Sequence, residues 1–144
     1  MLLSFLLQTA SANNFIFHWE SSFDIEICKN AGVTSKELKD VIDYWDDSIQ
    51  FNVKTISENS DCESIKNNVI QIKSGDNLLP DNVYGTTDIE WFYYNYAPDK
   101  KYINNATIKL SNKFIKKDNT TLKHEMGHAL GLDHYDHEIM RSHF

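Results

Sequence analysis

The sequence is poor in the residues that mark several classes of protein. Of its 144 residues only two are proline and five are glycine, which excludes collagen-like and low-complexity chains. Two cysteines are too few for a disulfide scaffold. Arg141 is the single arginine and the net charge is −7, so no basic stripe exists and we expect no nucleic-acid partner. No apolar run approaches the roughly 20 residues of a membrane-spanning helix, so we expect no membrane span.

What the chain does contain is enough apolar material for one core. Hydrophobic residues make up 41% of the sequence and aromatic residues 12%. A chain of this length buries roughly 68–70% of its unfolded surface, so it holds a hydrophobic core without depending on disulfides or structural metal ions. We therefore expect a single folded domain that acts as a monomer.

The N-terminal stretch has two interpretations. Met1–Leu7 is strongly apolar, and Ala10-Ser11-Ala12 fits the small-x-small pattern of a signal-peptidase site, but a positive n-region is missing. Residues 1–12 are therefore either a signal peptide or an apolar tail. The signal-peptide interpretation predicts a secreted or extracytoplasmic protein. In an exported protein Cys28 and Cys62 can form one disulfide, and two buried thiols are the equally weighted alternative.

Hydrophobic periodicity predicts an α+β fold with an α/β-like start. Thr34 and Glu37 form a capping box, and the apolar residues that follow recur at helical spacing over about 15 residues. That apolar stripe consists of Leu38, Val41, Ile42, Trp45 and Ile49. Five segments read as extended: 15–27, the stretch from Phe51, 67–73, 88–96 ended by Pro98, and 102–110. A last helix runs to about Leu130, which gives the order β-α-β-β-β-β-α.

The most informative stretch is His124 to His134, which reads HEMGHALGLDH. His124 and His128 are four residues apart and lie on one face of a helix, so their imidazoles can converge on one ion. His134 would lie about 15 Å along the axis of a continuous helix and could not reach that ion. Gly131 resolves this, because glycine at a helix end takes a left-handed conformation and turns the chain sharply.

Three neutral imidazoles with one open position are typical of a catalytic zinc site. Glu125 is adjacent to the first ligand and can reach a water at the metal, which predicts the role of general base. The pattern HExxHxxGxxH arises by chance in about 2 of 100,000 chains of this composition, so it is far more specific than short motifs.

This motif, followed by a nearby methionine, resembles the metzincin metallopeptidases, and its wording is closest to the matrixin-like branch. The resemblance implies a zinc endopeptidase, with residues 13–144 as the catalytic domain. It implies a twisted five-stranded mixed sheet, a backing helix and an active-site helix. It also implies that Met140 belongs to a Met-turn under the zinc ligands. The fourth strand, about Thr86–Tyr94, would be antiparallel at the sheet edge and pair with an extended peptide substrate.

One departure from the family pattern keeps the function open. Only ten residues follow His134, a very short C-terminal part for the family, whose longer segment builds the specificity pocket. A zinc-binding module that recognises peptides without cleaving them is therefore the alternative function.

Asp76, Asp81 and Asp88 lie where matrixins often hold calcium, but their spacing matches no EF-hand loop, and a solvated acidic loop is the other interpretation.

Overall fold

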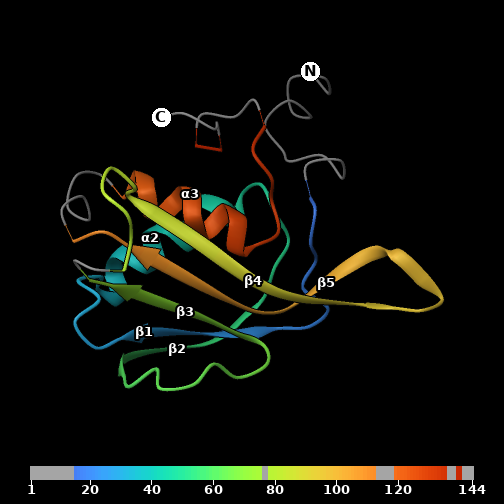
Figure 1. Ribbon diagram of the computed structural model, residues 1–144, viewed down its shortest axis with the longest axis horizontal. Coiled ribbons are helices and arrows are strands. Elements are labelled where there is room, and N and C mark those ends of the chain that lie inside the picture. Colours follow the sequence, from blue (N-terminus) through green and yellow to red (C-terminus); the bar gives the residue numbers. More distant parts are fainter. Residues whose placement is uncertain (1–14, 76–77, 113–118, 136–138, 141–144) are drawn as a thin grey trace.

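The computed structural model describes residues 15–75, 78–112, 119–135 and 139–140, which form a five-stranded mixed sheet and two helices (Figure 1). The elements follow the order β1 (Phe23–Cys28), α2 (Ser35–Asp46), β2 (Val53–Ser60), β3 (Val69–Ser74), β4 (Gly85–Tyr94), β5 (Ala97–Leu110) and α3 (Thr120–Ala129). The predicted α+β class and element order are confirmed. The interpretation of residues 1–12 lies outside the described residues.

The sheet has the strand order β2-β1-β3-β5-β4. β1 pairs in parallel with both β2 and β3, and β3 pairs in parallel with β5. β4 pairs antiparallel with β5 and forms an edge of the sheet. The predicted position and direction of this fourth strand are therefore confirmed, and one long side of β4 has no strand partner among the described residues.

Helix α2 begins where its capping box predicts. The Thr34 hydroxyl accepts a hydrogen bond from the Glu37 backbone N–H at 3.1 Å, which satisfies a free donor of the first turn. Leu38, Val41 and Trp45 are fully buried against the sheet and α3. The helix has 12 residues rather than about 15, so Ile49 is buried just beyond its end instead of on its last turn.

Trp45 joins the two helices. Its indole Nε1 donates to the Lys123 carbonyl of α3 at 2.8 Å, and the side chain has no exposed surface. Figure 1 shows α2 and α3 together on one face of the sheet, with α3 beside β4. α2 is therefore the predicted backing helix, and it supports α3 from behind.

The prediction for the first extended segment is only partly correct. Regular strand begins at Phe23, whereas Phe15 and His18 form isolated bridges with Leu132 and Tyr102. Trp19 Nε1 donates to the Ala129 carbonyl at 2.8 Å. Residues 15–19 thus pack against the end of α3, because their aromatic rings find an apolar surface there.

Pro98 does not end a strand, contrary to the prediction. It lies inside β5, close to the turn that joins β4 to β5 in one long hairpin. Proline lacks an N–H donor and is tolerated near strand ends and at irregularities, and the pairing register shifts between Phe92 and Tyr94 at this point. Figure 1 shows the hairpin projecting well beyond the rest of the sheet.

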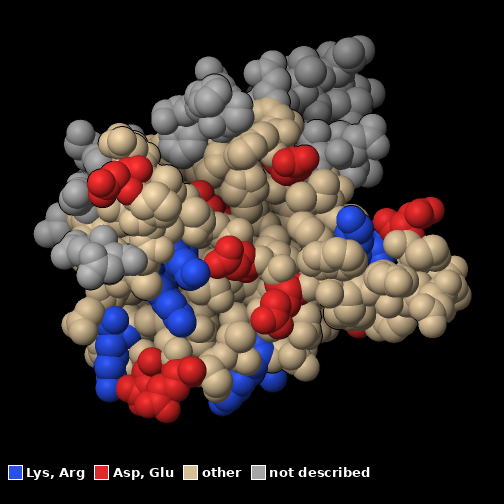
Figure 2. Space-filling model, viewed as in Figure 1, with Lys and Arg blue, Asp and Glu red and all other residues tan. Residues whose placement is uncertain are grey.

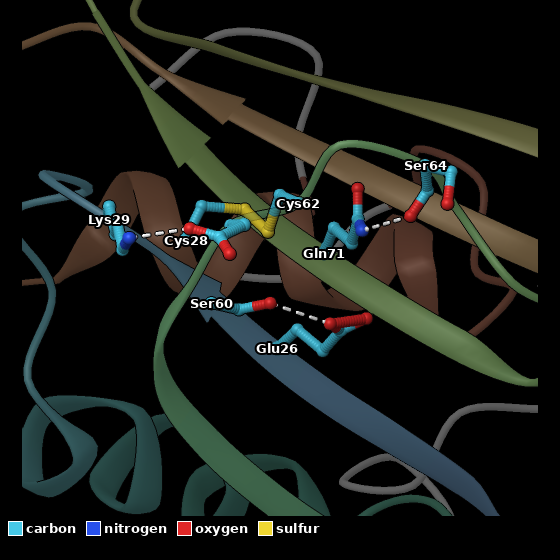
Figure 3. The surroundings of a disulfide bond; sticks show 8 residues. Glu26, Cys28, Lys29, Ser60, Cys62, Ser64 and Gln71 are labelled. Atoms are coloured by element: carbon cyan, nitrogen blue, oxygen red, sulfur yellow. Dashed lines mark hydrogen bonds and ion pairs between the residues drawn. A yellow bond between two sulfur atoms is a disulfide. The ribbon is translucent and has the colours of Figure 1, made fainter.

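Cys28 and Cys62 form a disulfide, so the interpretation as two free thiols is wrong (Figure 3). The bond fastens the loop after β2 to the end of β1. Within this loop the Ser64 carbonyl accepts a hydrogen bond from Gln71 Nε2 at 3.0 Å. Gln71 alternates with the core residues Ile70 and Ile72 along β3, so the loop covers the sheet face opposite the helices.

The surface carries both signs of charge. In the face drawn in Figure 2, acidic and basic side chains are interspersed over its described part rather than gathered by sign. None of the helices described is both long and apolar enough to cross a membrane. The disulfide is compatible with an extracellular protein, since such bonds persist in oxidising compartments.

Candidate metal centre

Helix α3 carries the first two predicted ligands, and the turn after it carries the third. His124 is buried, His128 is half-buried and His134 is exposed. Gly131 has φ +109°, and the Leu132 N–H donates to the Gly127 carbonyl at 3.0 Å. This pairing, with a left-handed glycine after the helix, is a Schellman motif. The turn predicted from Gly131 is thus confirmed, and it returns His134 towards the helix.

The three imidazoles converge on one point. Nε2 of His128 lies 3.1 Å from Nε2 of His124 and 3.2 Å from Nε2 of His134, and the third separation is also 3.2 Å. Nitrogen ligands at the usual zinc distance of about 2.0–2.1 Å in a tetrahedral arrangement are separated by about 3.3–3.4 Å. The observed triangle is slightly smaller than this and close to the size that a tetrahedral metal requires.

In His124 and His128 the hydrogen bond of the Nδ1 atom determines that Nε2 faces the point where the three imidazoles converge. His124 Nδ1 donates to the Ile139 carbonyl at 2.6 Å, and His128 Nδ1 donates to the Leu132 carbonyl at 2.8 Å. Carbonyl oxygens only accept, so in the neutral rings Nδ1 carries the proton and Nε2 carries the lone pair. Two lone pairs that face each other at 3.1 Å do not form a hydrogen bond, whereas a shared cation satisfies both. The donor set thus fits a metal ion.

Burial keeps these ligands in the form that binds metal. Desolvation lowers the pKa of His124 to about 4, although the hydrogen bond to the Ile139 carbonyl acts in the opposite direction. Burial also lowers the pKa of His128. Both imidazoles are therefore neutral at pH 7 and do not need to lose a proton before they coordinate.

Glu125 is held by the edge strand. Thr87 Oγ1 of β4 lies 2.6 Å from Glu125 Oε2 and 3.0 Å from the Glu125 carbonyl oxygen, and it donates to this residue. Gly85 lies two residues earlier, where a Cβ atom would come within 2.9 Å of Glu125 Cγ. Burial raises the pKa of Glu125 to about 6, opposed by the Thr87 hydrogen bond. A buried carboxyl with such a pKa suits proton transfer near neutral pH.

Met140 packs under α3. It is fully buried, and a Cβ atom on Gly127 would collide with its sulfur and come within 2.9 Å of Trp45. The preceding residue, Ile139, provides the carbonyl that accepts from His124. Residues 139–140 thus contact α3 through both Gly127 and His124.

The histidines open into a groove of about 780 Å³. It is lined by Gly85, Thr87 and Ile89 of β4 and by Leu132 and Asp133 of the turn after α3. Glu125 lines the same groove. The sheet edge, the buried carboxyl and the three imidazoles therefore face one space.

The described residues give no support to the calcium prediction. Asp88 forms an ion pair with Lys109 at 3.0 Å, and Asp76 lies outside the described part of the chain. Within that part the three histidines are the one group of three or more ligand side chains close enough to share an ion.

Sequence reasoning missed Thr87 and Gly127. Thr87 is 38 residues from Glu125, and nothing local distinguishes its hydroxyl from other strand threonines. Gly127 lies inside the histidine motif. A glycine in the interior of a helix indicates close packing, so the sequence could have predicted its contact.

Comparison of the chain with protein-family models, with curated proteins and with solved structures finds no match.

Proposed function

We propose that this protein is a zinc-dependent endopeptidase of the metzincin type. The observation that carries the proposal is the convergence of three imidazole Nε2 atoms, 3.1–3.2 Å apart, in an open groove that Glu125 and an unpaired sheet edge also line. Three histidines with room for a further ligand are typical of catalytic rather than structural zinc sites.

His124, His128 and His134 would hold the zinc through Nε2. When bound, zinc supplies a Lewis acid that polarises the substrate carbonyl and lowers the pKa of a water towards 7. The carbonyl oxygens of Ile139 and Leu132 fix the rings of the first two ligands in the required tautomer.

Glu125 is the proposed general base. Its carboxylate takes the proton of the water that attacks the scissile carbonyl, and then passes this proton to the leaving amine. Thr87 holds one carboxylate oxygen by a hydrogen bond of 2.6 Å, so the orientation of the base is set before substrate binds.

β4 is the proposed docking edge. On its outer side β4 has no strand partner among the described residues, and residues of β4 line the groove, so this edge can pair with an extended peptide by strand addition. The hydrogen bond from Thr87 to Glu125 joins this edge directly to the base. We therefore propose extended polypeptides as substrates.

Two further features support the same proposal. The buried contact of Met140 with Gly127 beneath the ligand-bearing helix supports its role as the Met-turn methionine. The disulfide between Cys28 and Cys62 supports action outside the cytoplasm.

The test measures zinc content and peptide cleavage on the same preparations. The parent should bind one zinc and cleave peptides of a fluorescence-quenched library, lose this activity with a chelator and regain it with zinc. Glu125→Gln should keep the zinc but lose about 100- to 10,000-fold in turnover, as expected for a lost general base. His128→Ala should lose the metal, because two imidazoles are a poor tetrahedral set.

The outcomes separate the candidate functions. A zinc-loaded Glu125→Gln variant as active as the parent would remove Glu125 from the mechanism. A zinc-loaded parent that binds library peptides without cutting them would favour the peptide-recognition module. A parent that takes up less than half an equivalent of zinc would contradict both.

A further inference from the structure

Two exposed aromatic side chains lie along β4 beyond the candidate metal centre. Thr87, Ile89, Trp91 and Tyr93 are alternate residues of the strand, and the pairing register with β5 shifts between Glu90 and Trp91. Thr87 and Ile89 line the groove, whereas Trp91 and Tyr93 lie farther out, with 45% and 50% of their surfaces exposed. We call Trp91 and Tyr93 the aromatic strip.

The aromatic strip is continuous with the groove. Phe17 lines the groove, and its ring centroid lies 5.9 Å from that of Trp91. The rings of Trp91 and Tyr93 are 6.4 Å apart, and Lys101 Nζ lies 4.8 Å from the Trp91 ring centroid. Apolar side chains therefore continue from Ile89 and Phe17 onto the projecting hairpin, with the Lys101 ammonium over the Trp91 ring.

The other face of the same hairpin is satisfied by contacts within the protein. There the rings of Phe92 and Tyr102 stack at 5.6 Å, and Tyr94 packs against both. The Tyr94 hydroxyl donates to Glu20 Oε2 at 2.7 Å. This face thus packs on itself and contacts the body through Glu20, while Trp91 of the aromatic strip contacts Phe17 on the face that the groove shares.

We propose that the aromatic strip selects the substrate, by binding large apolar or aromatic side chains of the peptide that adds to β4. An added strand places alternate side chains beside those of β4 on the same face, and aromatic neighbours of this kind attract each other. The inference rests on the proposed function, since the peptide concerned is the one held at the metal centre.

The geometry of a strand fixes where these side chains must be. Trp91 and Tyr93 follow Thr87 by four and six residues, which is about 13 Å and 20 Å along an extended chain. The selected peptide positions are therefore four and six residues from the one opposite Thr87, all on one side of it.

The test compares two peptides for each candidate position. It starts from a library peptide that the parent cleaves, with the cut located by mass spectrometry. Quenched derivatives carry either phenylalanine or alanine at the distal positions, on the N-terminal or the C-terminal side of the cut. On one of the two sides the ratio of kcat/KM for the phenylalanine peptide to that for the alanine peptide should be at least about fivefold.

The variants assign this ratio to the aromatic strip. In the double variant Trp91→Ala and Tyr93→Ala the ratio should fall close to one. Tyr96→Ala is the matched control, because Tyr96 is 84% exposed on the same hairpin but stacks on Tyr94 at 5.3 Å, away from the strip. The control should keep the parental ratio. A ratio near one in the parent, or a ratio that the double variant keeps, would overturn the proposal.

Binding distinguishes this inference from the proposed function. A library peptide that zinc-loaded Glu125→Gln protein binds is chosen, and its derivatives with phenylalanine or alanine at the distal positions are titrated against this protein by fluorescence polarisation. If the parent cleaves no peptide, the proposed peptidase function is contradicted. The proposed role of the aromatic strip is still supported if the phenylalanine peptide binds more tightly than the alanine peptide and the double variant loses this preference. Equal binding of both peptides would overturn the strip whether or not the parent is a peptidase.

Discussion

At the scale of the residue, the candidate site depends on a few contacts between distant parts of the chain. The hydroxyl of Thr87 touches the carboxylate of Glu125 at 2.6 Å, and backbone carbonyls set the proton positions of His124 and His128. None of these partners is itself a predicted ligand or base. Their effect is to fix orientation, which proton transfer and metal binding both require.

We expect Thr87→Val to lower kcat for peptide cleavage about 10- to 100-fold, because the isosteric side chain cannot hold the Glu125 carboxylate in place. KM and zinc content should stay at parental values, since backbone edge and ligands are unchanged. Thr87→Ser keeps a hydroxyl and should restore most of the rate. A valine variant with parental kcat, or a serine variant equally impaired, would show that the hydrogen bond does not position the base.

At the scale of the element, the end of α3 brings the third histidine to the other two. Gly131 adopts φ +109°, and its carbonyl accepts from the Ile16 N–H at 2.9 Å. A Cβ atom at this position would collide with the Phe17 carbonyl oxygen. The turn therefore needs glycine both for its backbone conformation and for the close approach of residues 16–17.

We expect Gly131→Ala to lower the free energy of unfolding by at least about 1–2 kcal/mol, from the left-handed conformation alone. The collision with Phe17 should also displace His134 and weaken zinc binding at least tenfold, on the order of 1.4 kcal/mol. Chemical denaturation and zinc titration against a competing chelator measure the two effects.

Gly75→Ala provides the control for this turn. Gly75 has no left-handed conformation, and its Cβ would meet only the flexible Leu78 side chain at 3.3 Å. It should change zinc affinity little. Equal zinc affinity in the Gly131→Ala variant and the parent would mean that the turn does not position His134.

At the scale of the whole molecule, the two faces of the sheet are covered by different means. The helices bury one face through an apolar core that includes Trp45, Ile70 and Ile108. The loop after β2 covers part of the other face near Gln71, and the disulfide holds this loop to β1. Stability of the domain therefore has an apolar contribution on the side of the metal centre and a covalent one on the opposite side.

Removing the disulfide by Cys28→Ser and Cys62→Ser should cost about 3–4 kcal/mol of unfolding free energy, the chain-entropy value for a loop of this length. Zinc bound per folded molecule should not change, because the ligands lie on the helix side. Asp61→Asn is the control: it breaks the exposed ion pair with Lys29 beside Cys62 and should cost under about 1 kcal/mol. Denaturation midpoints that match the parent in the double serine variant would contradict the prediction.

The sequence by itself determined the elements whose cause is local. A capping box and an apolar stripe gave the start and the buried face of α2, and the four-residue spacing of His124 and His128 gave the shared helical face. The glycine at position 131 predicted the turn that brings His134 back towards the helix, because few residues other than glycine adopt a positive φ at a helix end. These features need no information from distant parts of the chain.

Tertiary structure alone decided what depends on long-range pairing. Three features depend on contacts between segments that no local sequence pattern predicts. They are the extension of the β4–β5 hairpin through Pro98, the packing of residues 15–19 on α3 and the hydrogen bond from Thr87 to Glu125. From the sequence, the pairing of Cys28 with Cys62 was one of two interpretations. The structure decides for the disulfide, because it places the loop after β2 beside the end of β1. Hydrophobic periodicity tells which face of an element is buried, but not which distant element buries it, and that choice placed Glu125 against the sheet edge.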